Sequence, residues 1–190
     1  AIAKGTSTIF LGGLVYMLIL VSDSILQMGS IGLGLLYAAR GIGTGIGPII
    51  ARQYFTDEGQ WIVVMGASIT LTGTMYLVVG LTDVWWMMFV FVLLAHAASG
   101  ANWVTSTVLL QKRSEDNFRG RVFSTEWLLF TFGNSLSVVL ASILLEWQLF
   151  ELQQLIILYA VGLIVAGLLW LATVANWERN WLQKRLSPKG

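Results

Sequence analysis

The 190-residue sequence has no cysteine, one histidine, two prolines and few charged residues. Without cysteine the chain forms neither a disulfide nor a thiolate metal site, and a single histidine excludes bis-histidine haem ligation. Charged residues make up 11% of the chain and hydrophobic residues 56%, whereas soluble domains average about 25% charged residues. A soluble enzyme, a nucleic-acid-binding protein and a disordered chain are therefore unexpected. The apolar surface has to face a lipid bilayer.

Six apolar stretches are long enough to cross a bilayer as helices, which takes roughly 20 residues each. The stretches are Gly5–Ser22, Ile31–Tyr54, Trp61–Leu81, Val84–Leu110, Val122–Leu145 and Leu152–Ala175. They are continuous apolar runs, whereas the strands of a membrane barrel alternate between apolar and polar residues. We predict an all-α membrane protein, with a six-helix transmembrane bundle over residues 1–175 and a polar tail over residues 176–190.

Ten of the eleven basic residues fall on one side of this topology. They are Lys4, Arg52, Lys112, Arg113, Arg119, Arg121, Arg179, Lys184, Arg185 and Lys189. The loops on the opposite side contain no basic residue; their charged residues are Asp23, Asp83, Glu146 and Glu151. The positive-inside rule then places both termini and the tail in the cytoplasm.

Arg52 lies two residues from the end of the second span, and two other charged residues lie deeper within the spans, where charge is costly. Arg40, near the middle of the second span, costs roughly 2.5–3.5 kcal/mol to insert. It either contacts an anionic substrate or acts as a gating charge, or it bonds backbone carbonyls or another span. Glu126 lies about one turn inside the fifth span. It is either held at the membrane edge by Arg119 and Arg121, or it is a proton-coupling site with a raised pKa.

The fourth span contains the only histidine, His96, and the amide Asn102. Helical spacing places His96 on one face with Ser99 and Gly100. An imidazole on such a face either lines a cavity and transfers protons or hydrogen-bonds to a neighbouring helix.

The second span contains Gly41, Gly43, Gly45 and Gly47, followed by Pro48. Two pairs of these glycines are four residues apart, a spacing that lets another helix approach closely. Pro48 lacks an N–H and leaves the carbonyl four residues earlier without its helical partner, so we expect a bend.

No enzymatic site is evident. A six-helix intramembrane serine protease would need a Gly-x-Ser-Gly type of nucleophile site, and the nearest match, residues 66–69, lacks the closing glycine. No cluster of metal ligands is present either, so we predict no catalytic residue, no metal and no cofactor.

The connector over residues 109–123 reads LLQKRSEDNFRGRVF. We expect Asp116 or Asn117 to cap the helix that follows. The glutamine, the short acidic stretch and the run Arg119-Gly120-Arg121 with the next valine resemble the loop between helices ten and eleven of bacterial exporters of the major facilitator superfamily. The second span, from Ala38 through Arg40 to Pro48, resembles helix eight of the same branch, which includes siderophore and drug exporters. One departure is Ala51, which stands where the family's loop motif has an aspartate.

The resemblance implies that the six spans are helices seven to twelve, the carboxy-terminal half of a twelve-helix fold. It implies secondary active transport of a small solute, as an exporter driven by a proton or ion gradient in a bacterial inner membrane. The implied partners are the lipid bilayer, a small-molecule substrate and an amino-terminal six-helix half, in the same polypeptide or in a second chain. No nucleic acid is expected as a partner.

The family plan of three-plus-three inverted repeats also gives places to the polar residues of the spans. It implies that His96 and Asn102 border the central cavity, while Arg40 and Glu126 lie near the interface between the halves. The alternative is a membrane subunit that does not transport and instead scaffolds or regulates a larger complex.

Overall fold

The structure is a computed structural model that describes residues 2–177, with side chains from residue 4 onward. The predicted polar tail therefore lies, from residue 178 on, outside the described residues.

The described chain consists of six long helices and contains no strand. The helices are α1 (Ile2–Leu20), α2 (Gly29–Tyr54), α3 (Glu58–Leu81), α4 (Trp85–Arg113), α5 (Arg119–Glu146) and α6 (Leu152–Trp170). Two π-helical turns, η1 (Val21–Ile25) and η3 (Leu171–Ala175), extend α1 and α6, and a 3-10 turn, η2 (Asp116–Phe118), precedes α5. All six helices are long and apolar enough to cross a membrane. The prediction of an all-α chain with six helices long and apolar enough to span a membrane is confirmed.

Polar side chains mark two of the helix starts. Asp57 accepts a hydrogen bond from the backbone N–H of Gly59 at the start of α3, and Glu151 and Gln154 form a capping box at the start of α6. The start of α5 differs from the expectation, because Phe118 occupies the N-cap position without a side-chain cap.

The helix contacts of the first triplet, α1 to α3, have counterparts in those of the second triplet, α4 to α6. Helix α2 packs on α4, and its counterpart α5 packs on α1. Helix α3 also packs on α4, and its counterpart α6 packs on α1. Helices α3 and α6 pack on each other, whereas the backbones of the consecutive pairs α1/α2 and α4/α5 come close at few points. If successive helices cross the membrane in alternating directions, this pairing pattern is the one that a three-plus-three inverted repeat would give.

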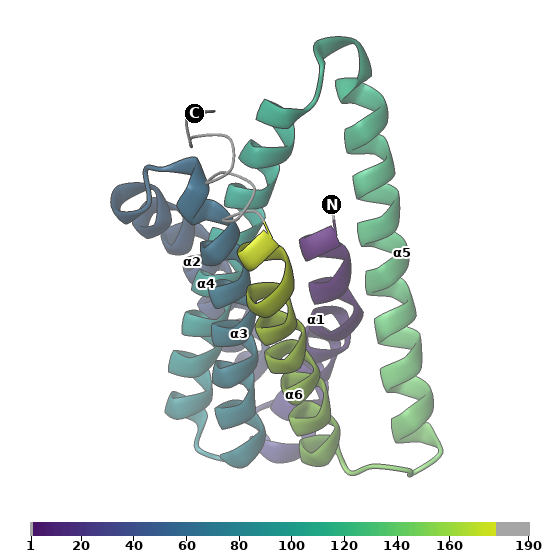
Figure 1. The fold of residues 1–190 in the computed structure, drawn as a ribbon. Helices are drawn as coiled ribbons and strands as arrows, with labels where there is room; N and C mark the ends of the chain where they lie inside the picture. Colours follow the sequence, from purple (N-terminus) through teal and green to yellow (C-terminus); the bar gives the residue numbers. More distant parts are fainter. Residues whose placement is uncertain (1, 178–190) are drawn as a thin grey trace, which may run out of the picture.

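The six helices are buried to different extents. Helix α3 is the most buried, whereas α2 and α5 are the least buried of the six. Figure 1 shows α5 along the edge of the bundle, beside α1. Its outward side is apolar, with Leu128 and Phe132 more than half exposed. A surface of this kind is stable against lipid or against another helical bundle.

Candidate functional site

A cavity of about 450 Å³ lies between α1, α2, α4 and α5. Helices α3 and α6 contribute no residue to the lining. Its polar and aromatic lining residues include Tyr16, Tyr37, Arg40, Thr44, His96, Ser99, Trp103, Phe130 and Asn134. Two of the predicted site residues, Arg40 and His96, thus line one cavity. Ser99 and Gly100 line it too, as expected from their spacing relative to His96.

The glycines of α2 determine how closely this helix approaches α4 along the cavity wall. A Cβ atom on Gly43 would overlap the backbone at Leu93, and one on Gly47 would overlap the carbonyl of Ala97. Gly41 and Gly45 have no such neighbour within 4 Å. Only one of the two glycine pairs therefore packs against a helix of this bundle.

Pro48 lies inside α2, which continues as a helix on both sides of it. The carbonyl of Thr44 cannot receive its usual hydrogen bond because Pro48 has no N–H. This carbonyl lies against Gly100 of α4, where a Cβ atom would be 2.6 Å from the oxygen. Gly100 therefore provides the space for the part of α2 that the proline leaves without a hydrogen bond.

Arg40 is half-buried and lies beside the ring of Tyr37, with 5.4 Å between the guanidinium carbon and the ring centroid. Among the described residues its side chain has no ion pair and no hydrogen-bond partner. One interpretation of Arg40 was a bond to backbone carbonyls or to another span. The described residues contain no such bond. Arg40 is also the only Asp, Glu, Lys or Arg among the described lining residues.

His96 lines the cavity but is 96% buried, with 4% exposed. Its Nε2 atom is 2.9 Å from the hydroxyl oxygen of Tyr76 on α3, a side chain without any exposed surface. The two rings meet edge to face, with 5.9 Å between centroids. The hydrogen bond to a neighbouring helix, one of the two interpretations of His96, is present.

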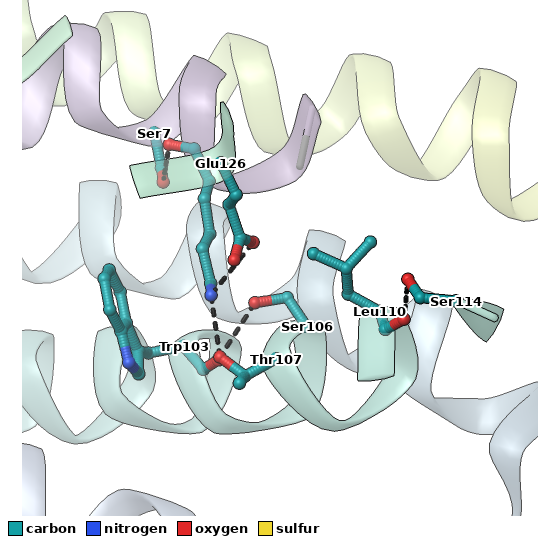
Figure 2. A network of polar contacts seen from close by, with 8 residues as sticks. Ser7, Trp103, Ser106, Thr107, Leu110, Ser114 and Glu126 are labelled. Atoms are coloured by element: carbon teal, nitrogen blue, oxygen red, sulfur yellow. Dashed lines mark hydrogen bonds and ion pairs between the residues drawn. The ribbon is translucent and has the colours of Figure 1, made fainter. Parts of the chain in front are cut away.

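Lys4 and Glu126 form an ion pair at 3.0 Å that joins α1 to α5, with 4% and 7% of the side chains exposed. The Lys4 ammonium also donates to the hydroxyl of Thr107 at 2.7 Å and lies 4.2 Å from the centroid of a Trp103 ring. Figure 2 shows Glu126, Thr107 and Trp103 around this contact. The network connects α1, α4 and α5 and borders the cavity, which Trp103 also lines.

The sequence-based expectation that Glu126 is held by Arg119 and Arg121 is wrong. The described ion pair of Glu126 is with Lys4, far away in the sequence, instead of with the nearby Arg119 or Arg121. Arg119 pairs with Asp116 at 2.6 Å, so Asp116 neutralises a cation at the start of α5 instead of capping that helix. Arg121 and Gly120 are exposed.

Asn102 is 5% exposed and is not among the residues that line the cavity. Its Oδ1 atom is buried and has no hydrogen-bond partner among the described residues. Glu126 is not among the lining residues either, although its network borders the cavity. The four predicted site residues therefore do not line one common cavity.

The sequence did not identify Lys4, Tyr76, Tyr37 or Asn134. Lys4 stands at the very start of the first span and was interpreted only as a basic residue of one membrane side. Tyr76 and Tyr37 are aromatic residues in apolar stretches, so nothing local distinguishes them from packing residues. Their roles follow from which helices pack together.

Comparisons of the chain with protein-family models, with characterised proteins and with solved structures found no match. The superfamily resemblance and the function that it implies therefore remain predictions, to be weighed on the structure itself.

Proposed function

We propose that the chain transports a small solute across a membrane, as the carboxy-terminal half of a secondary active transporter of the major facilitator type. In this proposal the solute passes through the cavity between α1, α2, α4 and α5, and a proton or ion gradient drives its export. Both termini are in the cytoplasm of a bacterium, because the basic residues gather at one end of the spans.

The observation that supports this proposal most is the cavity. Its wall contains one charged residue, Arg40, and several polar residues, although such groups are costly inside a membrane bundle. The helices that form its sides, α2 and α5, are the two least buried of the six. A second bundle against α2 and α5 would cover both helices and complete the enclosure.

The packing pattern gives independent support. Two inverted triplets are the internal plan of each half of the superfamily, with the first helix of each triplet bordering the central cavity. The corresponding helices here, α1 and α4, both line the cavity.

A test that needs no known substrate is sidedness of access. The chain has no cysteine, so Ser99→Cys in the cavity introduces its only thiol. In the whole protein, freed of other thiols, a transporter exposes this thiol in turn to each side. A membrane-impermeant maleimide should label it in right-side-out and in inside-out vesicles. Thr74→Cys on α3, outside the cavity lining, is the matched control and should react little from either side.

The exposed surfaces of α2 and α5 also fit the alternative, a scaffold subunit that binds another membrane protein through these helices. A scaffold has a static pocket. Labelling of Ser99→Cys from one side alone, unchanged by an imposed proton gradient, would contradict transport and favour this alternative.

A further inference from the structure

The cavity wall contains three polar side chains that are not engaged elsewhere in the described chain. Arg40 of α2, Ser99 of α4 and Asn134 of α5 all line the cavity. Among the described residues none of the three side chains has a hydrogen-bond partner. Polar groups at membrane depth are costly unless they are satisfied by protein, water or a ligand. Three such groups from three helices at one cavity indicate a binding site.

The charge in this wall has one sign. Arg40 is permanently cationic, and no carboxylate stands among the described lining residues. The buried cation Lys4 is paired with the carboxylate of Glu126. Arg40, which lies within a span, has no such counter-charge among the described residues. Its planar guanidinium binds carboxylate, sulfonate or phosphate groups through two parallel hydrogen bonds.

The rest of the wall is aromatic and apolar. The rings of Trp103 and Phe130 lie 4.8 Å apart in an edge-to-face arrangement, and Tyr16 and Tyr37 complete an aromatic lining around Arg40. The volume of about 450 Å³ lies within the range of pockets for small organic ligands, about 300–1,000 Å³. A small inorganic anion would leave most of this apolar surface without contacts.

We propose that the cavity binds an organic anion with an apolar or aromatic body, whose acidic group pairs with Arg40 while its body lies against Trp103 and Phe130. Ser99 and Asn134 contribute hydrogen bonds to the polar end of this ligand. This inference rests on the proposed transport function, for which it names the class of solute. A water-soluble organic anion and an anionic lipid share the required chemistry, and we assign the site to the water-soluble one.

The first test is the charge selectivity of a thiol in the cavity. Ser99→Cys is reacted with anionic 2-sulfonatoethyl methanethiosulfonate and with cationic 2-(trimethylammonio)ethyl methanethiosulfonate, and each rate is divided by that of neutral methyl methanethiosulfonate. The anionic reagent should react faster, and Arg40→Gln should lower the anion-to-cation ratio by about tenfold or more, because one nearby charge is removed. Arg40→Lys keeps the charge and should keep most of the selectivity.

The matched control is Arg52→Gln. Arg52 is on the same helix as Arg40 but is exposed and does not line the cavity, so its removal should leave the ratio unchanged. The rate with the neutral reagent reports whether each variant keeps an accessible, folded cavity. Equal rates with both charged reagents in the parent, or equal effects of Arg40→Gln and Arg52→Gln, would overturn the inference.

The second test identifies the source of the anion. In nanodiscs of phosphatidylcholine, 2-naphthoate should protect Ser99→Cys from the neutral reagent, whereas 2-naphthylmethylammonium and 2-naphthylmethanol should not. Protection by phosphatidylglycerol in the disc, with no further effect of 2-naphthoate, would overturn the assignment to a soluble anion. Anion selectivity without access from both membrane sides would leave this site standing and contradict transport. Access from both sides without anion selectivity would contradict the anion site and leave the transport proposal standing.

Discussion

Lys4 of α1 and Glu126 of α5 are far apart in the sequence but form an ion pair at 3.0 Å, in which both side chains are almost fully buried. Thr107 of α4 accepts a hydrogen bond from the same ammonium group. The backbones of the consecutive helices α4 and α5 come close at few points, although the ring of Trp103 on α4 also contacts the rings of Trp127 and Phe130 on α5. The pair therefore holds three helices together at the end of the cavity where the basic residues gather.

Breaking this pair on one side should be costly. Lys4→Met removes the cation paired with the buried Glu126 carboxylate, and Glu126→Gln removes the anion paired with the buried ammonium, so each variant should lose about 3 kcal/mol of stability. The double variant Lys4→Met/Glu126→Gln removes both charges and should lose clearly less than the sum of the two. Unfolding measured by steric trapping in micelles gives the four free energies of the cycle. Additive losses would mean that the two residues do not depend on each other.

The pair between Lys112 and Glu58 gives the contrasting case. It joins the end of α4 to the start of α3, and about half of each side chain is exposed, 51% and 48%. Exposed ion pairs are screened by solvent and contribute about 0–1 kcal/mol. Lys112→Ala should therefore lower the unfolding free energy by less than about 1 kcal/mol. Half a molar salt should remove even this loss, while leaving the cost of Lys4→Met largely in place. A larger loss for Lys112→Ala than for Lys4→Met would contradict the burial of the Lys4 pair.

The glycines of α2 allow a test within one helix. Gly47→Ala places a methyl group on the carbonyl of Ala97 in α4, so α2 and α4 have to move apart and the variant should be destabilised. Gly45→Ala has open space around its Cβ position and should be neutral or slightly more stable, because alanine favours helix by about 1 kcal/mol over glycine. Midpoints of thermal unfolding in detergent compare the two. Equal midpoints would mean that Gly47 does not set the helix crossing.

The sequence predicted the helices well because each one depends on a local property, namely a continuous apolar run of sufficient length. The last span, for example, ends at Ala175 in both the prediction and the structure. The fifth was expected to begin at Val122, whereas its helix begins at Arg119. Charged residues can occupy the first turn of a spanning helix because this turn lies outside the hydrocarbon.

The site could be predicted only in part, because its contacts depend on which helices meet. Arg40 and His96 were recognisable from the cost of polar groups in an apolar run. The partner of Glu126 was not, since the nearest cations in the sequence, Arg119 and Arg121, are not those nearest in space. Lys4 becomes the partner because α1 packs against α5, a pairing that no apolar pattern along the chain specifies.

The hydrogen bond between Tyr76 and His96 should stabilise the bundle from its interior. Tyr76→Phe keeps the ring and the edge-to-face contact but removes the hydroxyl, so the Nε2 atom of His96 is left buried without its partner, whichever of the two groups donates. A buried polar atom without a partner costs about 1–3 kcal/mol.

Tyr54→Phe is the matched control, because Tyr54 is 69% exposed and its hydroxyl can bond to water. Replacing both partners, Tyr76→Phe with His96→Leu, should recover part of the loss, since no polar atom is then left unpaired. Steric trapping measures all four proteins. An unfolding free energy of Tyr76→Phe that equals that of Tyr54→Phe would show that the His96 ring finds another partner, and the imidazole would then be available to the cavity.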